Sequence, residues 1–99
     1  MTAIVSMYST RFCPYCVAAK QLLERKGVAY EDIPVDGDPQ LRRVMSERSG
    51  QRTVPQIWIG DTHVGGFTDL AALDKRGELD RMLQAAREQA AGQSAQPDN

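Results

Sequence analysis

The 99-residue chain lacks three features that mark specialised classes of protein: abundant cysteine, an excess of basic residues and a long hydrophobic run. With two cysteines, it is not a disulfide-dense secreted scaffold. A net charge of −1 disfavours a broad nucleic-acid surface, which needs a basic excess. The apolar opening Ala3–Tyr8 is too short to span a membrane and lacks the basic start of a signal peptide. We therefore expect a soluble, cytoplasmic protein in which close cysteines are kept reduced.

The first third of the chain alternates strand-like and helix-like segments. The β-favouring residues of Ala3–Tyr8 predict a buried strand. A helix is predicted at Pro14–Lys26, where alanine and leucine recur four residues apart and proline suits the first turn. Gly27 fits the left-handed position after that helix, and Val28–Val35 predicts a second strand. A strand, a helix and a strand in this order predict parallel pairing through a right-handed crossover.

The middle of the chain predicts one helix and one hairpin. Asp38 is expected to cap a helix that begins at Pro39 and ends before Gly50. Two short β-runs within Pro55–Val64 lie on either side of Gly60-Asp61, a pair typical of a two-residue hairpin turn.

Two more helices are predicted near the C-terminus, at Asp69–Lys75, capped by Thr68 or Asp69, and at Glu78–Gln89. The whole order predicts an α/β fold with a four-stranded mixed sheet and helices on both faces. Residues 1–89 are expected to form one domain. Residues 90–99 have no side chain larger than glutamine and nothing apolar beyond alanine, so a disordered tail is expected.

The two cysteines lie in the segment Cys13-Pro14-Tyr15-Cys16, at the beginning of the first predicted helix. Free N–H groups and the positive end of the helix dipole stabilise a thiolate at Cys13. Because proline has no N–H, the expected donors are the amides of Tyr15 and Cys16. Cys16 lies one turn into the helix and is expected to be shielded. The pattern predicts Cys13 as the nucleophile and Cys16 as the resolving thiol of a disulfide exchange.

Two other interpretations of the cysteine pair remain open on this pattern alone. Two cysteines at this spacing also form half of a structural zinc site, which needs four ligands, but the chain adds a single nitrogen ligand, His63. No metal site is therefore predicted, and His63 is expected to be a surface residue. An incidental pair is the second alternative. The position of the pair after a strand and at a helix start favours the redox interpretation.

Three motifs together resemble the glutaredoxins of the small bacterial dithiol type, in the thioredoxin superfamily. They are CPYC at Cys13–Cys16, TVPQIWI at Thr53–Ile59 and GGFTDL at Gly65–Leu70. The resemblance implies a thioredoxin fold and a glutathione-dependent thiol–disulfide oxidoreductase that acts in electron transport and cell redox homeostasis. It also implies glutathione as co-substrate, no bound prosthetic group, and a monomer that reduces protein disulfides and glutathionylated proteins. A separate NADPH-dependent reductase would recycle the glutathione.

The resemblance also implies a binding site for glutathione. Thr53, Val54 and Pro55 are expected to face Cys13 across a cis Val54–Pro55 bond, with the Val54 backbone pairing with the ligand as an added strand would. From the residues alone, Pro55 also fits a trans proline at the start of an edge strand. The γ-glutamyl end of the ligand is expected to contact the next turn and helix start, at Gly66, Phe67, Thr68 and Asp69. Tyr15 is expected to pack on the ligand or to shield the sulfur.

Two positions depart from the resembled pattern. Many members have a lysine three residues before the first cysteine, where this chain has Thr10, and two acidic residues after the glycines, where the first is here Thr68. Arg11 is the expected replacement for the missing basic group, and Arg52 is a second candidate. The alternatives for the whole protein are a thioredoxin-like electron donor reduced by a flavoprotein reductase and a glutathione-assisted [2Fe–2S] dimer.

Overall fold

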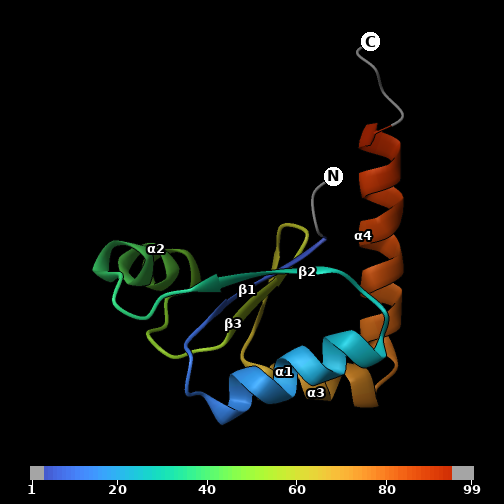
Figure 1. The fold of residues 1–99 in the computed structure, drawn as a ribbon. Coiled ribbons are helices and arrows are strands. Elements are labelled where there is room, and N and C mark those ends of the chain that lie inside the picture. Colours follow the sequence, from blue (N-terminus) through green and yellow to red (C-terminus); the bar gives the residue numbers. More distant parts are fainter. Residues whose placement is uncertain (1–3, 95–99) are drawn as a thin grey trace.

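A four-stranded mixed sheet forms the centre of the computed structural model, which describes residues 4–94 (Figure 1). The strands lie in the order β2-β1-β3-β4. The central β1 pairs in parallel with β2 and antiparallel with β3, and β3 forms an antiparallel hairpin with β4. The mixed sheet predicted from the element order is confirmed. The strands are β1 (Val5–Ser9), β2 (Tyr30–Pro34), β3 (Gln56–Ile59) and β4 (Thr62–Gly65).

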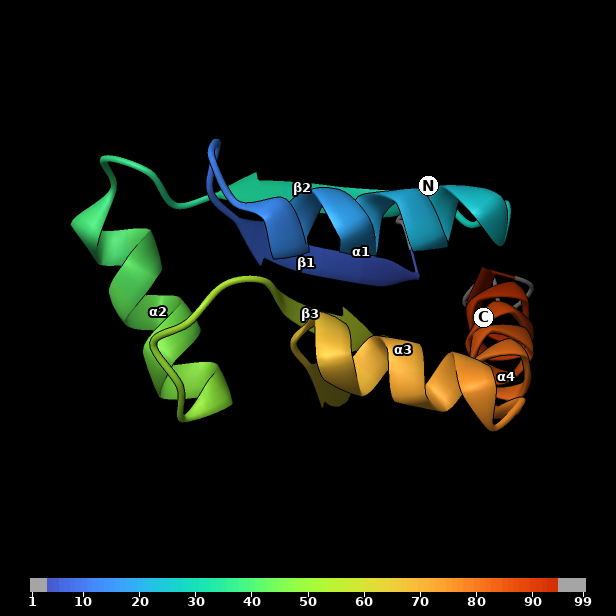
Figure 2. The same ribbon diagram turned by 90° about the horizontal axis from the view of Figure 1, so that it is seen from below.

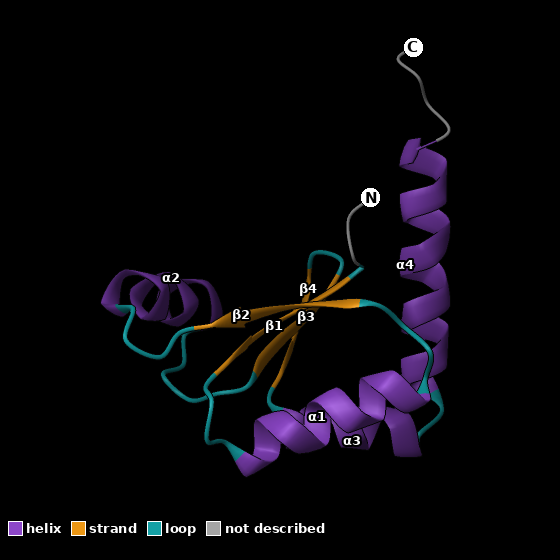
Figure 3. Ribbon diagram, in the orientation of Figure 1, coloured by secondary structure: helices purple, strands orange, loops and turns teal. Residues whose placement is uncertain are grey.

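Helices cover both faces of this sheet, as predicted. Figures 2 and 3 show α1 and α3 side by side beneath the sheet, whereas α2 lies beside the end of β2. Met45 of α2 packs against the opposite face of the sheet. The helix α4 packs its Leu79 and Leu83 into the same core as α1 and α3. The helices are α1 (Pro14–Arg25), α2 (Pro39–Ser49), α3 (Phe67–Lys75) and α4 (Glu78–Ser94).

Side-chain alternation along the central strands divides the core into two clusters. Met7 and Ile57 point to the face covered by α1, α3 and α4, where they join Leu23 and Leu70. The neighbouring positions Tyr8 and Trp58 point to the opposite face and pack with Met45 of α2. The buried apolar area on both faces supplies most of the free energy that holds the helices to the sheet.

The helix ends next to the strands follow local rules. The Asp38 carboxylate accepts from the amide of Leu41 at 3.1 Å, which confirms the predicted cap of α2. After α1, Gly27 takes a left-handed φ of 67° and the Val28 amide donates back to Leu23 at 3.3 Å. Because Val28 helps to end the helix, β2 begins at Tyr30 and not at Val28 as expected.

Two helix boundaries differ from the expected ones. Helix α3 begins at Phe67 with Gly66 as its N-cap, two residues earlier than predicted. Helix α4 continues to Ser94, past the expected end at Gln89, so residues 90–94 are helical and do not form a disordered tail. Alanine and glutamine in this stretch favour helix, which the expectation based on buried side chains alone overlooked. Residues 95–99 of the expected tail lie outside the described residues.

Within residues 4–94, no helix combines the length and the apolar character that crossing a bilayer requires.

Candidate active site

Cys13 is the N-cap residue of α1, where the loop after β1 turns into the helix. Its backbone is extended, with φ −126° and ψ 106°, and Pro14 takes the first helical position. The Cys13 Sγ accepts a hydrogen bond from the Cys16 amide at 3.1 Å, as the sequence predicted for one of its two expected donors. A sulfur that receives a free helix amide at the positive end of the dipole is favoured as a thiolate. The geometry thus provides an anion-stabilising position for Cys13.

Cys16 has different surroundings although it lies on the next turn. Its side chain is 1% exposed, against 9% for Cys13. The pKa of the Cys16 thiol is raised to about 12, chiefly by burial and also by the interaction with Cys13, while the backbone of Thr10 and the charge of Lys20 act in the opposite direction. Cys16 is therefore a neutral, shielded thiol at neutral pH.

The loop before β3 faces the first cysteine. The Val54–Pro55 bond is cis, as the resemblance implied and against the trans alternative. The Val54 carbonyl oxygen lies 3.8 Å from the Cys13 Sγ, within reach of a weak S–H donor. Pro55 is buried, and its own carbonyl lies beside Gly66, 3.5 Å from the place where a side-chain Cβ there would sit. The structure thus brings the second and third motifs together next to Cys13.

Gln56 holds this loop in place, a role that the sequence did not reveal. Its side chain is fully buried, and its Nε2 donates to the carbonyl of Thr53 at 2.9 Å and to the side chain of Gln51 at 2.9 Å. Its Oε1 contacts the His63 Nε2 at 2.8 Å. His63 is half-buried against the ring of Trp58, so the expectation of a surface histidine is wrong. The sequence feature that indicates an anchor is a polar residue between Pro55 and a run of apolar strand residues.

The turn between β4 and α3 is tightly packed. The Asp69 carboxylate accepts from the Gly66 amide at 3.0 Å and so caps the start of α3. Gly65 has φ +115°, and a Cβ there would collide with this carboxylate, so both the conformation and the space require glycine. The expected caps, Thr68 or Asp69, are replaced by Gly66 because Asp69 reaches back from the third helical position.

Aromatic rings border the first turn of α1. The ring of Tyr15 is 62% exposed and stacks on Phe67, with 6.4 Å between ring centroids. Phe67 is the first residue of α3, so this contact joins the first motif to the third across the surface. Phe12, directly before Cys13, is 90% exposed. Exposed aromatic residues therefore precede and follow Cys13 in the sequence, and one of them links α1 to α3.

The family follows from direct comparison of sequences. A glutaredoxin family model matches residues 5–64, which is more than half of the chain. This chain belongs to the glutaredoxin family. As a glutaredoxin it is a thiol–disulfide oxidoreductase with a thioredoxin fold.

Individual glutaredoxins match most of the chain. A glutaredoxin from Pseudomonas aeruginosa is 56% identical over 81 residues, which are 82% of this chain and 96% of that protein. Glutaredoxin 3 from Escherichia coli K12 is 51% identical over 81 residues, or 82% of this chain and 98% of that protein. A crystal structure of a buckwheat glutaredoxin–glutathione complex is similar with a TM-score of 0.79 and 29% identity, covering 85% of this chain and 79% of that one.

The position where many glutaredoxins have a basic residue lies beside a surface cavity of about 520 Å³. Thr10 and Arg11 line this cavity together with Lys20 and Asp36. The Arg11 amide donates to the Asp36 carboxylate at 2.8 Å, and this bond is the main cause that lowers the pKa of Asp36. The loop before Cys13 is thus tied to the loop after β2, with the Arg11 side chain exposed.

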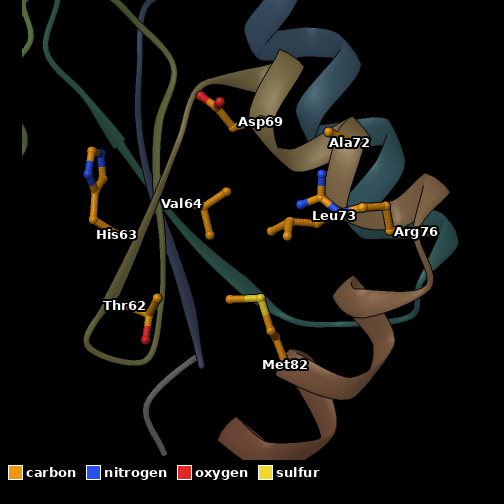
Figure 4. Close-up of a pocket in the computed structure, with 8 residues that line it drawn as sticks. All are labelled: Thr62, His63, Val64, Asp69, Ala72, Leu73, Arg76 and Met82. Atoms are coloured by element: carbon orange, nitrogen blue, oxygen red, sulfur yellow. The ribbon is translucent and has the colours of Figure 1, made fainter.

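A second cavity, of about 340 Å³, lies between β4, α3 and α4 (Figure 4). Figure 4 shows Val64, Leu73 and Met82 directed toward one another from these three elements, with Asp69 at one end. Neither cysteine lines this cavity. It is therefore separate from the surface around Cys13.

Proposed function

We propose that this glutaredoxin uses glutathione to reduce glutathionylated proteins and protein disulfides through Cys13 and Cys16. With a glutathionylated protein, the Cys13 thiolate attacks the glutathione sulfur, and the protein thiol leaves. A second glutathione thiolate attacks the Cys13–glutathione disulfide, releasing oxidised glutathione and regenerating the Cys13 thiolate. This route does not use Cys16.

With a protein disulfide, Cys13 first forms a mixed disulfide with one substrate sulfur, and the other leaves as a thiol. Cys16 then attacks the Cys13 sulfur, which releases the reduced substrate and closes a Cys13–Cys16 disulfide. Two glutathione molecules reduce that disulfide and leave as oxidised glutathione, which an NADPH-dependent reductase recycles. In both routes glutathione supplies the two electrons and two protons that reduce the disulfide, so no bound prosthetic group is needed.

The observation on which this proposal depends is the hydrogen bond from the Cys16 amide to the Cys13 Sγ at 3.1 Å, in a helix N-cap that faces Val54. A thiolate stabilised there is the nucleophile that both routes require. The Val54 backbone and the amides at the start of α3 offer partners to the backbone and carboxylate of a glutathione molecule. The similarity to a buckwheat glutaredoxin that forms a complex with glutathione supports glutathione as the ligand.

Each proposed contact has a specific residue. Thr53, Val54 and Pro55 border the cysteinyl part of the ligand, and Tyr15 packs against it. Phe67 and Thr68 present backbone amides to the γ-glutamyl carboxylate, and Gly66, which has no side chain, permits its close approach. One Asp69 oxygen already accepts from Gly66, so its other oxygen is the proposed acceptor for the γ-glutamyl amino group. Arg11 is the proposed partner of the glycine carboxylate.

The reaction places the protein in a reducing compartment, for which we propose the cytoplasm, and requires only one copy of the chain. A coupled assay with glutathione, glutathione reductase and NADPH tests the proposal on a glutathionylated peptide. We expect NADPH oxidation that depends on all three components and saturates with peptide. Turnover with a flavoprotein thioredoxin reductase, and none in the glutathione assay, would instead identify a thioredoxin-like donor.

A further inference from the structure

The inference concerns an ion pair behind the resolving cysteine. Lys20 of α1 and Asp32 of β2 are joined by a contact of 2.8 Å between Nζ and Oδ2, with about a third of each side chain exposed. The hydroxyl of Ser9 donates to the other oxygen of Asp32. Ser9 is 2% exposed. The Asp32 carboxylate is therefore held on one side by a buried hydroxyl of β1 and on the other side by Lys20. Asp32 thereby holds Lys20 in one position and raises its pKa.

This ion pair lies close to Cys16. Lys20 follows Cys16 by four residues in α1, which places the two side chains on the same helix face with roughly 5–6 Å between their Cβ atoms. The backbone of Thr10, next to Ser9, acts on Cys16 in the direction that lowers its pKa. Ser9, Thr10, Lys20 and Asp32 also line the 520 Å³ cavity, which gives water a route to this side of the helix.

Cys16 must ionise before it can resolve a mixed disulfide. Burial opposes this ionisation, and the neighbouring Cys13 opposes it as well. The remaining groups on this side are the Lys20 cation of α1 and, on β2, the Asp32 carboxylate and the Tyr30 hydroxyl, which both act on Lys20. Of these, Lys20 favours the Cys16 thiolate directly.

We propose that Lys20, held by Asp32 and Ser9, is a positioning residue that stabilises the Cys16 thiolate formed when the enzyme resolves a mixed disulfide with a protein. The Cys16 thiol gives its proton to water in the cavity, and its sulfur attacks the Cys13 sulfur. The bond between Cys13 and the substrate breaks, and the substrate leaves as a thiolate that takes up a proton. The inference rests on the dithiol route of the proposed function, and the glutathionylation route does not involve Lys20.

The test compares Lys20→Met with Lys26→Met in the full chain. Lys26 is a matched control, because it is the C-cap residue at the far end of the same helix from the cysteines, has a similar exposure and pairs with Asp74 at 2.7 Å and with Asp80 at 3.1 Å. The substrates are a peptide with one intramolecular disulfide and the same peptide reduced and glutathionylated. We expect Lys20→Met to lower kcat/KM roughly three- to tenfold for the disulfide peptide, since fewer thiolates form but each is more nucleophilic.

Lys20→Met is expected to reduce the glutathionylated peptide at the parent's rate. Lys26→Met is expected to reduce both the glutathionylated peptide and the disulfide peptide at the parent's rates. The alkaline rise in the rate of Cys16 attack should move to higher pH in Lys20→Met and return in Lys20→Arg. In a Cys16→Ser background, Lys20→Met should have no effect.

Equal kcat/KM of Lys20→Met and the parent on the disulfide peptide overturns the inference. An equal loss on both peptides also overturns it, because that indicates a general structural role. Failure of the parent in the glutathione assay would instead refute the proposed function.

Discussion

Cys13 and Cys16 are three residues apart in one helix start, and their surroundings differ in charge, access and hydrogen bonding. Cys13 lies at the N-cap, receives an amide at 3.1 Å and faces the loop at Val54. Cys16 is 1% exposed on the inner face of α1, and its pKa is raised to about 12, chiefly by burial. The comparison teaches that one helical turn separates a position that favours an anion from one that disfavours it. Identical side chains therefore acquire different chemical roles from the fold.

Replacing Cys13, the more accessible member of the pair, has the largest expected effect. In Cys13→Ser, reduction of both the glutathionylated peptide and the disulfide peptide should fall to the uncatalysed rate, because a serine hydroxyl is not ionised at the N-cap. The glutathione-coupled assay measures both rates, and circular dichroism checks the fold. Appreciable turnover of either peptide by this variant would show that Cys16 also acts as an entry nucleophile.

Replacing the buried member should remove only one of the two activities. Cys16→Ser is expected to reduce the glutathionylated peptide about as fast as the parent and to lose reduction of the disulfide peptide, because no second thiol can resolve that intermediate. The same coupled assay, run on the two peptides side by side, gives the ratio. If Cys16→Ser is as inactive as Cys13→Ser on the glutathionylated peptide, the single-thiol route is wrong.

The buried thiol itself should react only in alkaline solution. In Cys13→Ser, burial remains as the largest cause of the raised Cys16 pKa, so the thiol stays protonated and unreactive until pH rises well above neutrality. At pH 7 we expect alkylation by iodoacetamide roughly a hundredfold slower, or more, than for an ordinary cysteine. The same variant unfolded in urea is the control. A reaction that levels off near neutral pH would remove the distinction between the two thiols.

The smallest effect is expected for the edge of the Cys13 site. Arg11→Ala should raise the KM for glutathione roughly two- to fivefold, which is the usual range for one exposed ion pair. The Arg11 amide that bonds to Asp36 is retained in this variant, so the loop should keep its position. Arg52→Ala tests the second candidate for this basic group, in the loop before Thr53. An unchanged KM in Arg11→Ala excludes its side chain from the glutathione site.

Local patterns were sufficient to predict most of the secondary structure. Asp38 and Gly50 bound α2 as expected, because capping depends on neighbouring residues alone. The start of α3 was placed too late, since nothing in the local pattern shows that Asp69 reaches back to the Gly66 amide. The end of α4 was placed too early, since the expectation weighed buried side chains and not helix propensity.

The site was only partly predictable for a related reason. The position of Cys13 follows from Pro14 and the helix that begins there. The cis bond at Pro55 was expected from family resemblance and not from the residues, which by themselves favour a trans proline. The role of Gln56 depends in part on His63 of the next strand, and that of Lys20 on Asp32 of β2, so the sequence does not identify these partners.

The amino-acid order by itself determined where the helices and strands form and that a thiol stands at the head of the first helix, because these depend on interactions within a few residues. Tertiary structure decided how completely Cys16 is covered, how closely the Val54 carbonyl approaches Cys13 and which charges surround Cys16. These properties arise from burial and from contacts between distant segments. Both exist only once the helices have packed against the sheet.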